Sequence, residues 1–171
     1  MSYGSQAAFA AYCAARAYDL TAFDASAQTA ALVRASGFVD GLGYRDNGTG
    51  IRTPLWPGTP AVAGQANEWP REGASDIYGN AIASDAVPQR VEHAAYEVAF
   101  FDLGGGDINR SVAQDQVVIR ERFDTVEFQY AGANGETIDT RPMLPAVMDL
   151  LAPVISGGDR AGLYGITMVV A

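Results

Sequence analysis

Residues that could carry out chemistry are few in this chain of 171 residues. It has one histidine, His93, and one cysteine, Cys13. Glu92 and Glu97 flank His93, so one interpretation is a general base oriented by a carboxylate. However, no serine, cysteine or second acid is placed to complete a catalytic triad with this imidazole. The pattern therefore favours a histidine on a helix surface or at an interface.

The other candidate motifs also favour non-catalytic interpretations. Cys13 lies on the apolar side of a predicted helix, as a small buried residue would, and it has no partner for an internal disulfide. Residues 46–50 lack the alternating acids of a calcium loop, and the glycines at 104–106 follow a helix, whereas a dinucleotide-binding motif must begin one. All 11 basic residues are arginine, which excludes a Walker A loop and a Schiff-base lysine. We therefore predict a protein that is not an enzyme and holds no metal or cofactor.

A long loop over residues 44–84 carries aromatic and basic residues that could form a single-stranded-DNA groove, with bases stacked on rings and phosphates held by arginines. These residues are Tyr44, Arg45, Arg52, Trp56, Trp69 and Arg71. The opposing interpretation is that Trp69 packs on a helical core and the arginines pair with neighbouring acids. The formal net charge of −9 and the pI of about 4.4 favour this second interpretation, because non-specific DNA affinity comes from basic charge.

Helical spacing predicts the elements that must position these residues. The first predicted helix covers residues 5–18 and is capped by Ser5, and the second runs from about Asp24 or Ser26 to about Leu42. The third covers residues 85–103, with Asp85 as cap and Pro88 in the first turn, and the fourth covers residues 143–151 and is begun by Pro142. Alternating apolar residues predict one β-hairpin over residues 116–130. The expected core is Phe9, Tyr12, Leu32, Phe38, Val91, Ala94, Val98, Leu150 and Leu151.

These elements predict a mainly α fold: a small helical bundle with one β-hairpin, long loops and an extended C-terminal arm. The expected division is a helical domain over residues 1–155 and an arm over residues 156–171. No run of about 20 apolar residues and no basic leader is present, so we expect a soluble protein in a reducing compartment.

The arm contains an uncharged, β-prone segment made of Ile166, Thr167, Met168, Val169 and Val170. We expect it to pair with a strand of another chain, because such a segment is an aggregation hazard when it is left exposed. The alternative is that it folds back as a third strand on the chain's own hairpin.

Four motifs occur in a fixed order along the chain. They are AALVRASGFVDG at residues 30–41, EWPREG at 68–73, YGNAI at 78–82 and VPQRVEHAAYE at 87–97. This order resembles the head–tail connector (adaptor) proteins of tailed phages, a family also labelled DnaT-like single-stranded-DNA-binding protein. The resemblance covers about residues 5–155, and the predicted hairpin and the LLAPV segment at 150–154 agree with it.

The resemblance implies a structural virion protein: a ring of about twelve subunits between the portal and the tail terminator or stopper protein. The ring would be assembled in the host cytoplasm, would lie in the virion neck, and would serve as part of the DNA conduit without binding DNA specifically. Trp56, Trp69, Arg71 and the apolar residues of the arm are then structural or interface residues. An acidic, lysine-free surface agrees with free passage of DNA. The alternative is a single-stranded-DNA-binding replication protein of the DnaT-like type.

Overall fold

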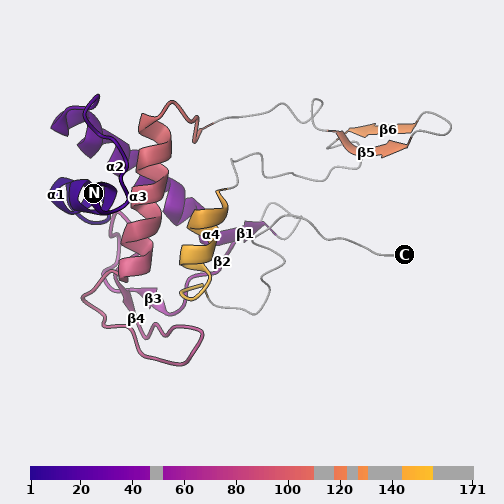
Figure 1. Cartoon of the computed structure of the whole chain (residues 1–171). Helices are drawn as coiled ribbons and strands as arrows, with labels where there is room; N and C mark the ends of the chain where they lie inside the picture. The colour runs from indigo at the N-terminus through magenta and orange to yellow at the C-terminus, as the bar shows by residue number, and fades with distance from the viewer. Residues whose placement is uncertain (47–51, 110–117, 123–126, 131–143, 156–171) are drawn as a thin grey trace.

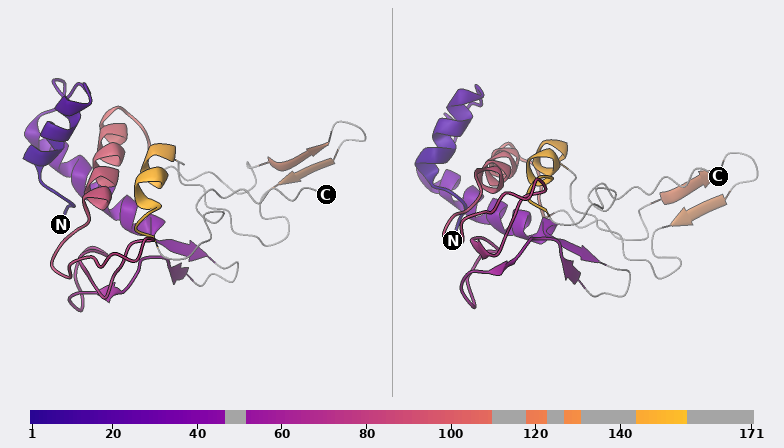
Figure 2. Two further views of the ribbon diagram at one scale, coloured as in Figure 1. Left: turned by 60° about the horizontal axis from the view of Figure 1, so that its bottom comes forward. Right: turned by 90° about the horizontal axis from the view of Figure 1, so that it is seen from below.

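The computed structural model describes residues 1–46, 52–109, 118–122, 127–130 and 144–155. Its helices are α1 (Gln6–Ala15), α2 (Ala25–Leu42), α3 (Gln89–Leu103) and α4 (Pro145–Leu151). Helix α3 packs on α2 and on α4, and α1 lies against α2 and α3 (Figures 1 and 2). The predicted mainly helical fold is confirmed. No helix in the described part of the chain is both long enough and apolar enough to cross a membrane.

The helix boundaries follow local capping chemistry. Ser5 caps α1 as predicted, and Asp24 caps α2; each accepts a hydrogen bond from the backbone N–H group three residues later. The prediction of Asp85 as the cap of α3 is wrong. Pro88 has a ψ of 134°, outside the helical region, so the helix begins one residue later. Helix α4 begins at Pro145, which occupies its first turn, and not at Pro142.

Short strands form three antiparallel pairs. They are β1 (Tyr44–Asp46) with β2 (Arg52–Pro54), β3 (Thr59–Pro60) with β4 (Arg71–Glu72), and β5 (Val118–Arg122) with β6 (Glu127–Tyr130). The β5–β6 pair is the predicted hairpin. The first two pairs lie within the predicted long loop, where strands of two or three residues are too short to leave an alternating pattern in the sequence.

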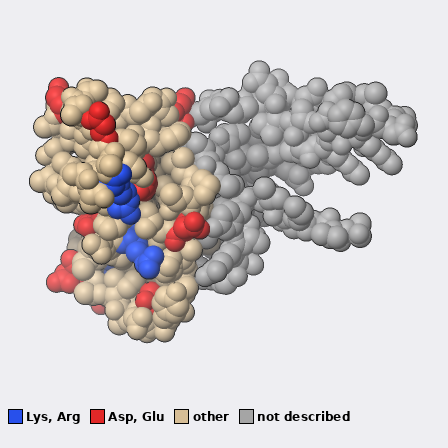
Figure 3. Space-filling model, viewed as in Figure 1, with Lys and Arg blue, Asp and Glu red and all other residues tan. Residues whose placement is uncertain are grey.

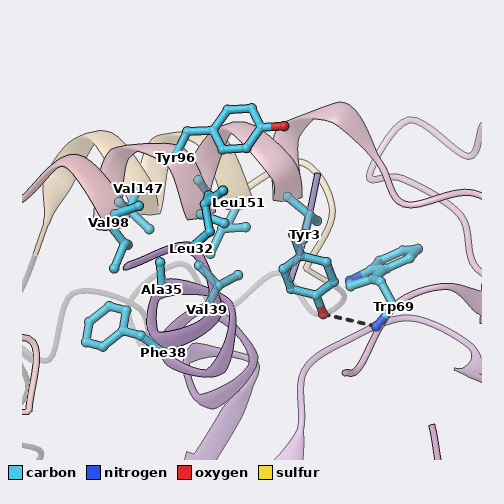
Figure 4. Packing of buried hydrophobic residues seen from close by; sticks show 14 of the residues in the cluster. Tyr3, Leu32, Ala35, Phe38, Val39, Trp69, Tyr96, Val98, Val147 and Leu151 are labelled. Atoms are coloured by element: carbon cyan, nitrogen blue, oxygen red, sulfur yellow. Dashed lines mark hydrogen bonds between the residues drawn. The ribbon is translucent and has the colours of Figure 1, made fainter. Parts of the chain in front are cut away.

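The core lies where α2 meets α3 and α4 (Figure 4). Of the nine residues expected there, Leu150 is only partly buried, because the apolar face of α4 turns Val147 and Leu151 inward instead. The other eight are buried. The predicted C-terminal arm, residues 156–171, lies outside the described residues.

Candidate nucleic-acid interface

The two tryptophans that the sequence offered for a stacking groove, the less favoured interpretation, are not on the surface. Trp56 and Trp69 are 3% and 2% exposed, and their rings meet edge to face with centroids 5.9 Å apart. Trp56 also covers Gly43 so closely that a Cβ there would lie 1.7 Å from the indole Nε1. The indoles therefore belong to the core and have no free face on which a base could stack.

Arg71 is buried and fully engaged within the chain. Its Nε donates to the carbonyl of Pro57 and its Nη2 to that of Gly58, both at 2.8 Å. Its Nη1 pairs with the Glu68 carboxylate at 2.6 Å, and Tyr44 donates to the other oxygen of that carboxylate at 2.5 Å. This arginine holds the loop together and is not available to a phosphate.

The remaining sequence-predicted residues divide into two groups. The backbones of Arg45 and Arg52 belong to the β1–β2 pair, where Arg45 lies opposite Thr53 and Arg52 opposite Asp46. The residues of the C-terminal arm, from Ile166 to Val170, lie outside the described part of the chain. The structure thus brings Tyr44, Trp56, Trp69 and Arg71 together as a structural unit, and it does not form from them the groove that was the less favoured interpretation of the sequence.

A partly buried polar network connects this loop to the rest of the domain. Tyr3 donates its hydroxyl hydrogen to Asp40 of α2 and accepts a hydrogen bond from the Trp69 N–H at 3.1 Å (Figure 4). The Glu68 N–H also donates to Asp40, at 3.2 Å. Burial raises the pKa of Asp40 to about 6, although the hydrogen bonds from Tyr3 and Glu68 act in the opposite direction.

A different surface carries accessible rings and charges, on the side of α3 turned away from α2. Its residues, here called the α3 face, are Arg90, His93, Glu97, Phe100 and Phe101. Their spacing of three, four, three and one residues places all five on one side of a helix. Arg90 is exposed, and the other four are partly buried. They are therefore accessible to a ligand in a way that the tryptophans are not.

The C-terminal end of α1 and the turn after it supply polar contacts to the α3 face. Arg16 lies 3.8 Å from the centre of the Tyr12 ring and 3.4 Å from the Glu97 carboxylate. Tyr12 donates to the same carboxylate at 2.7 Å. Glu97 thus fixes both side chains, and a cation–π contact holds the guanidinium over the ring.

Aromatic rings continue along this surface. Tyr18 is stacked on Phe100, with centroids 4.3 Å apart and planes 11° from parallel. Tyr12 contacts His93 at 4.6 Å. Burial, with a contribution from Arg16, holds the pKa of His93 below its ordinary value, which favours the neutral imidazole. The result is a row of ring faces with a cation beside it.

Charge on this surface is uneven (Figure 3). The basic side chains in that view lie in a short line, with acidic side chains around them. Of the four arginines whose side chains the structure describes, Arg16, Arg34 and Arg71 pair with Glu97, Asp102 and Glu68. Arg90 is exposed and has no ion pair among the described residues, although it interacts electrostatically with Asp76. It is therefore the described arginine best able to receive a phosphate.

A cavity of about 380 Å³ lies at the carboxyl end of the α3 face. Its α3 side is formed by Glu97, Phe100, Phe101 and Gly104, and the beginning of α4, residues 144–147, forms much of the opposite side. Its lining is mainly apolar, with Glu97 as the one charged residue. The volume is within the range of small-molecule pockets in proteins.

The catalytic candidates are placed among core and surface contacts. His93 contacts the rings of Tyr12 and Tyr96. Cys13 is buried, and burial raises the pKa of its thiol to about 11, so the reactive thiolate is disfavoured. Among the described residues, no group of three or more His, Cys, Asp or Glu side chains could hold a metal ion.

Sequence reasoning missed the α3 face. The spacing of His93, Glu97, Phe100 and Phe101 was a usable signal, because residues three or four positions apart lie on the same side of a helix. In the structure both Phe100 and Phe101 are only partly buried. The partners Arg16 and Tyr18 reach this surface only through the packing of α1, which no local pattern reveals.

Comparison with known proteins gives one match. A family model described as "Putative DnaT-like ssDNA binding protein" matches residues 1–169. No curated protein and no solved structure matches the chain. The head–tail connector prediction is therefore wrong, because the family model that matches almost the whole chain describes a single-stranded-DNA-binding protein and not a connector. The expected ring, portal contact and virion location had the connector resemblance as their basis.

Proposed function

The chain belongs to the DnaT-like ssDNA binding protein family, and from that premise we propose that it binds single-stranded DNA along the α3 face. One observation carries the placement of the site. It is the row of partly buried rings along α3 and the end of α1, with Arg16 and Arg90 beside it. Proteins that bind single strands combine stacking rings with cations that follow the backbone.

The rings provide the sequence-tolerant part of the interaction. Stacking of a base on an aromatic side chain contributes about 1–3 kcal/mol, whatever the base. Tyr18 and Phe100 are already stacked in parallel, so the pair is held rigid before any ligand arrives. A rigid platform loses little conformational entropy on binding.

The arginines provide the phosphate contacts. Arg90 lies in the first turn of α3, where the positive end of the helix dipole also favours an anion. Arg16, at the end of α1, lies beside Glu97, which is farther along α3 than Arg90. Because Glu97 already neutralises part of its charge, Arg16 contributes less to the affinity than Arg90. Single strands should therefore lie along α3, whose length is about 22 Å.

A binding titration with matched arginine variants tests this proposal. We expect a labelled single strand of about 20 nucleotides to bind at low salt in a fluorescence polarisation assay, and to bind better than the duplex of the same sequence. Arg90→Ala should weaken binding about fivefold through the loss of one phosphate contact. Arg34→Ala is the control, since this exposed arginine pairs with Asp102 on another side of α3.

Two results would contradict the proposal. One is the absence of binding to any single strand at low salt by the folded protein. The other is an equal loss of affinity in both arginine variants, which would show that the effect comes from total charge and not from the α3 face.

A further inference from the structure

We infer that the cavity between α3 and α4 takes one unpaired base of the bound strand and prefers a base with an exocyclic amino group, such as cytosine, over thymine. The inference rests on the proposed function and adds a base preference to it. The cavity continues the ring surface directly, because Phe100 both stacks on Tyr18 and lines the cavity.

The lining favours a flat, largely apolar ligand. Phe100 and Phe101 supply ring surfaces, and residues 144–147 supply aliphatic ones. Gly104 adds no side chain to the cavity. A Cβ at Gly106 would lie 2.3 Å from the Phe101 ring, so the ring occupies the space that a side chain at Gly106 would need. The two glycines therefore shape the cavity. Its volume of about 380 Å³ is enough for one base and its sugar.

The charge of the site excludes a phosphate as the occupant. Glu97 is the one charged residue in the lining, and the cavity lies at the carboxyl end of α3, where the helix dipole is negative. No described cationic side chain lines it. A neutral group that donates a hydrogen bond suits this environment, and a base meets that requirement where an anion does not.

Glu97 provides the discrimination between bases. Its Oε1 accepts from Tyr12 at 2.7 Å and lies 3.4 Å from Arg16, whereas its Oε2 has only a longer contact with Tyr18, at 3.3 Å. Oε2 can therefore accept a further hydrogen bond. Cytosine offers its N4 amino group for this, whereas thymine places its O4 acceptor at the equivalent position.

The experiment compares oligo(dC) with oligo(dT) of equal length against the wild-type chain and one cavity-filling variant. We expect wild type to bind oligo(dC) about five to ten times more tightly. Gly104→Leu should remove this preference, leaving residual binding to both strands through the rest of the α3 face. A Cβ at Gly104 meets only two backbone oxygens at 3.5 Å, so the backbone accepts the change.

Gly37→Leu is the matched control. This glycine is exposed on α2, and a Cβ there meets nothing within 4 Å. The control should keep the wild-type preference for oligo(dC). Binding of both strands with equal affinity by wild type, or a preference that survives in Gly104→Leu, would overturn the base-pocket inference while leaving the proposed function in place. Failure of wild type to bind either strand would instead refute the proposed function.

Discussion

Asp40 is a partly buried carboxylate that connects separate segments of the chain. Its side chain accepts hydrogen bonds from the Tyr3 hydroxyl and the Glu68 N–H, and so joins the N-terminus, α2 and the loop before β4. The charged groups that face it are Glu68, which disfavours ionisation, and Arg71, which favours it. Burial outweighs the favourable contacts, so the pKa rises from 3.8 to about 6.

The raised pKa of Asp40 predicts a loss of stability with rising pH. The folded chain binds this proton more readily than the unfolded chain, so the stabilisation is present below about pH 4 and is lost as the pH rises to about 6. Asp40→Asn keeps the acceptor oxygen and removes the titration. Urea unfolding of both proteins should show the variant gaining about 2–3 kcal/mol relative to wild type between those pH values. A difference between the two proteins that does not change with pH would contradict this.

Among the elements, α2 and α3 illustrate what sequence can predict. Their apolar residues recur at helical spacing and end at glycines, so both helices and the residues that face the core were predictable. Leu32 and Val98 are buried, as expected. The start of α3 was misplaced, because Asp85 is a good capping residue by type, and only the backbone angles at Pro88 show that the helix begins later.

The core assignment on α2 gives a prediction with a neighbouring control. Leu32 is 1% exposed and packs at the α2–α3 contact, so Leu32→Ala should lower the free energy of unfolding by about 2–4 kcal/mol. Val33, the next residue on the same helix, is 47% exposed. Val33→Ala should change the stability by less than about 0.5 kcal/mol in the same denaturant titration. Equal losses in the two variants would show that the burial pattern of α2 is misassigned.

The candidate site was less predictable than the elements that carry it. Tryptophans beside arginines in a Pro-rich loop match the pattern of a stacking groove. However, Trp56 and Trp69 are buried in the core, and Arg71 donates hydrogen bonds to backbone carbonyls. Burial of this kind depends on contacts between distant segments. The α3 face, by contrast, combines residues from α3 with the end of α1, separated by about 80 positions.

For the whole molecule, a net charge of −9 limits how DNA can be bound. The overall field repels a polyanion, so binding depends on local contacts. If Arg90 of the α3 face and the neighbouring Arg16 both contact phosphates, the plot of log K against log salt should have a slope of about −1.4 for a single strand. Titrations at several salt concentrations measure it, and Arg90→Ala should reduce the slope by about half. A slope steeper than about −3 would contradict a contact made by two arginines.

The long-range bonds of the N-terminal segment also set an order of events during synthesis. The Tyr12 hydroxyl is hydrogen-bonded to Glu97, 85 positions later, and the Tyr3 hydroxyl to the backbone N–H of Trp69, 66 positions later. At about 5–20 residues per second, the partners of α1 leave the ribosome roughly 4–17 seconds after α1 itself. Helix α1 is made before these partners and therefore reaches its final place only after they have been made. Until then the ring faces of α1 are open to chaperones and proteases.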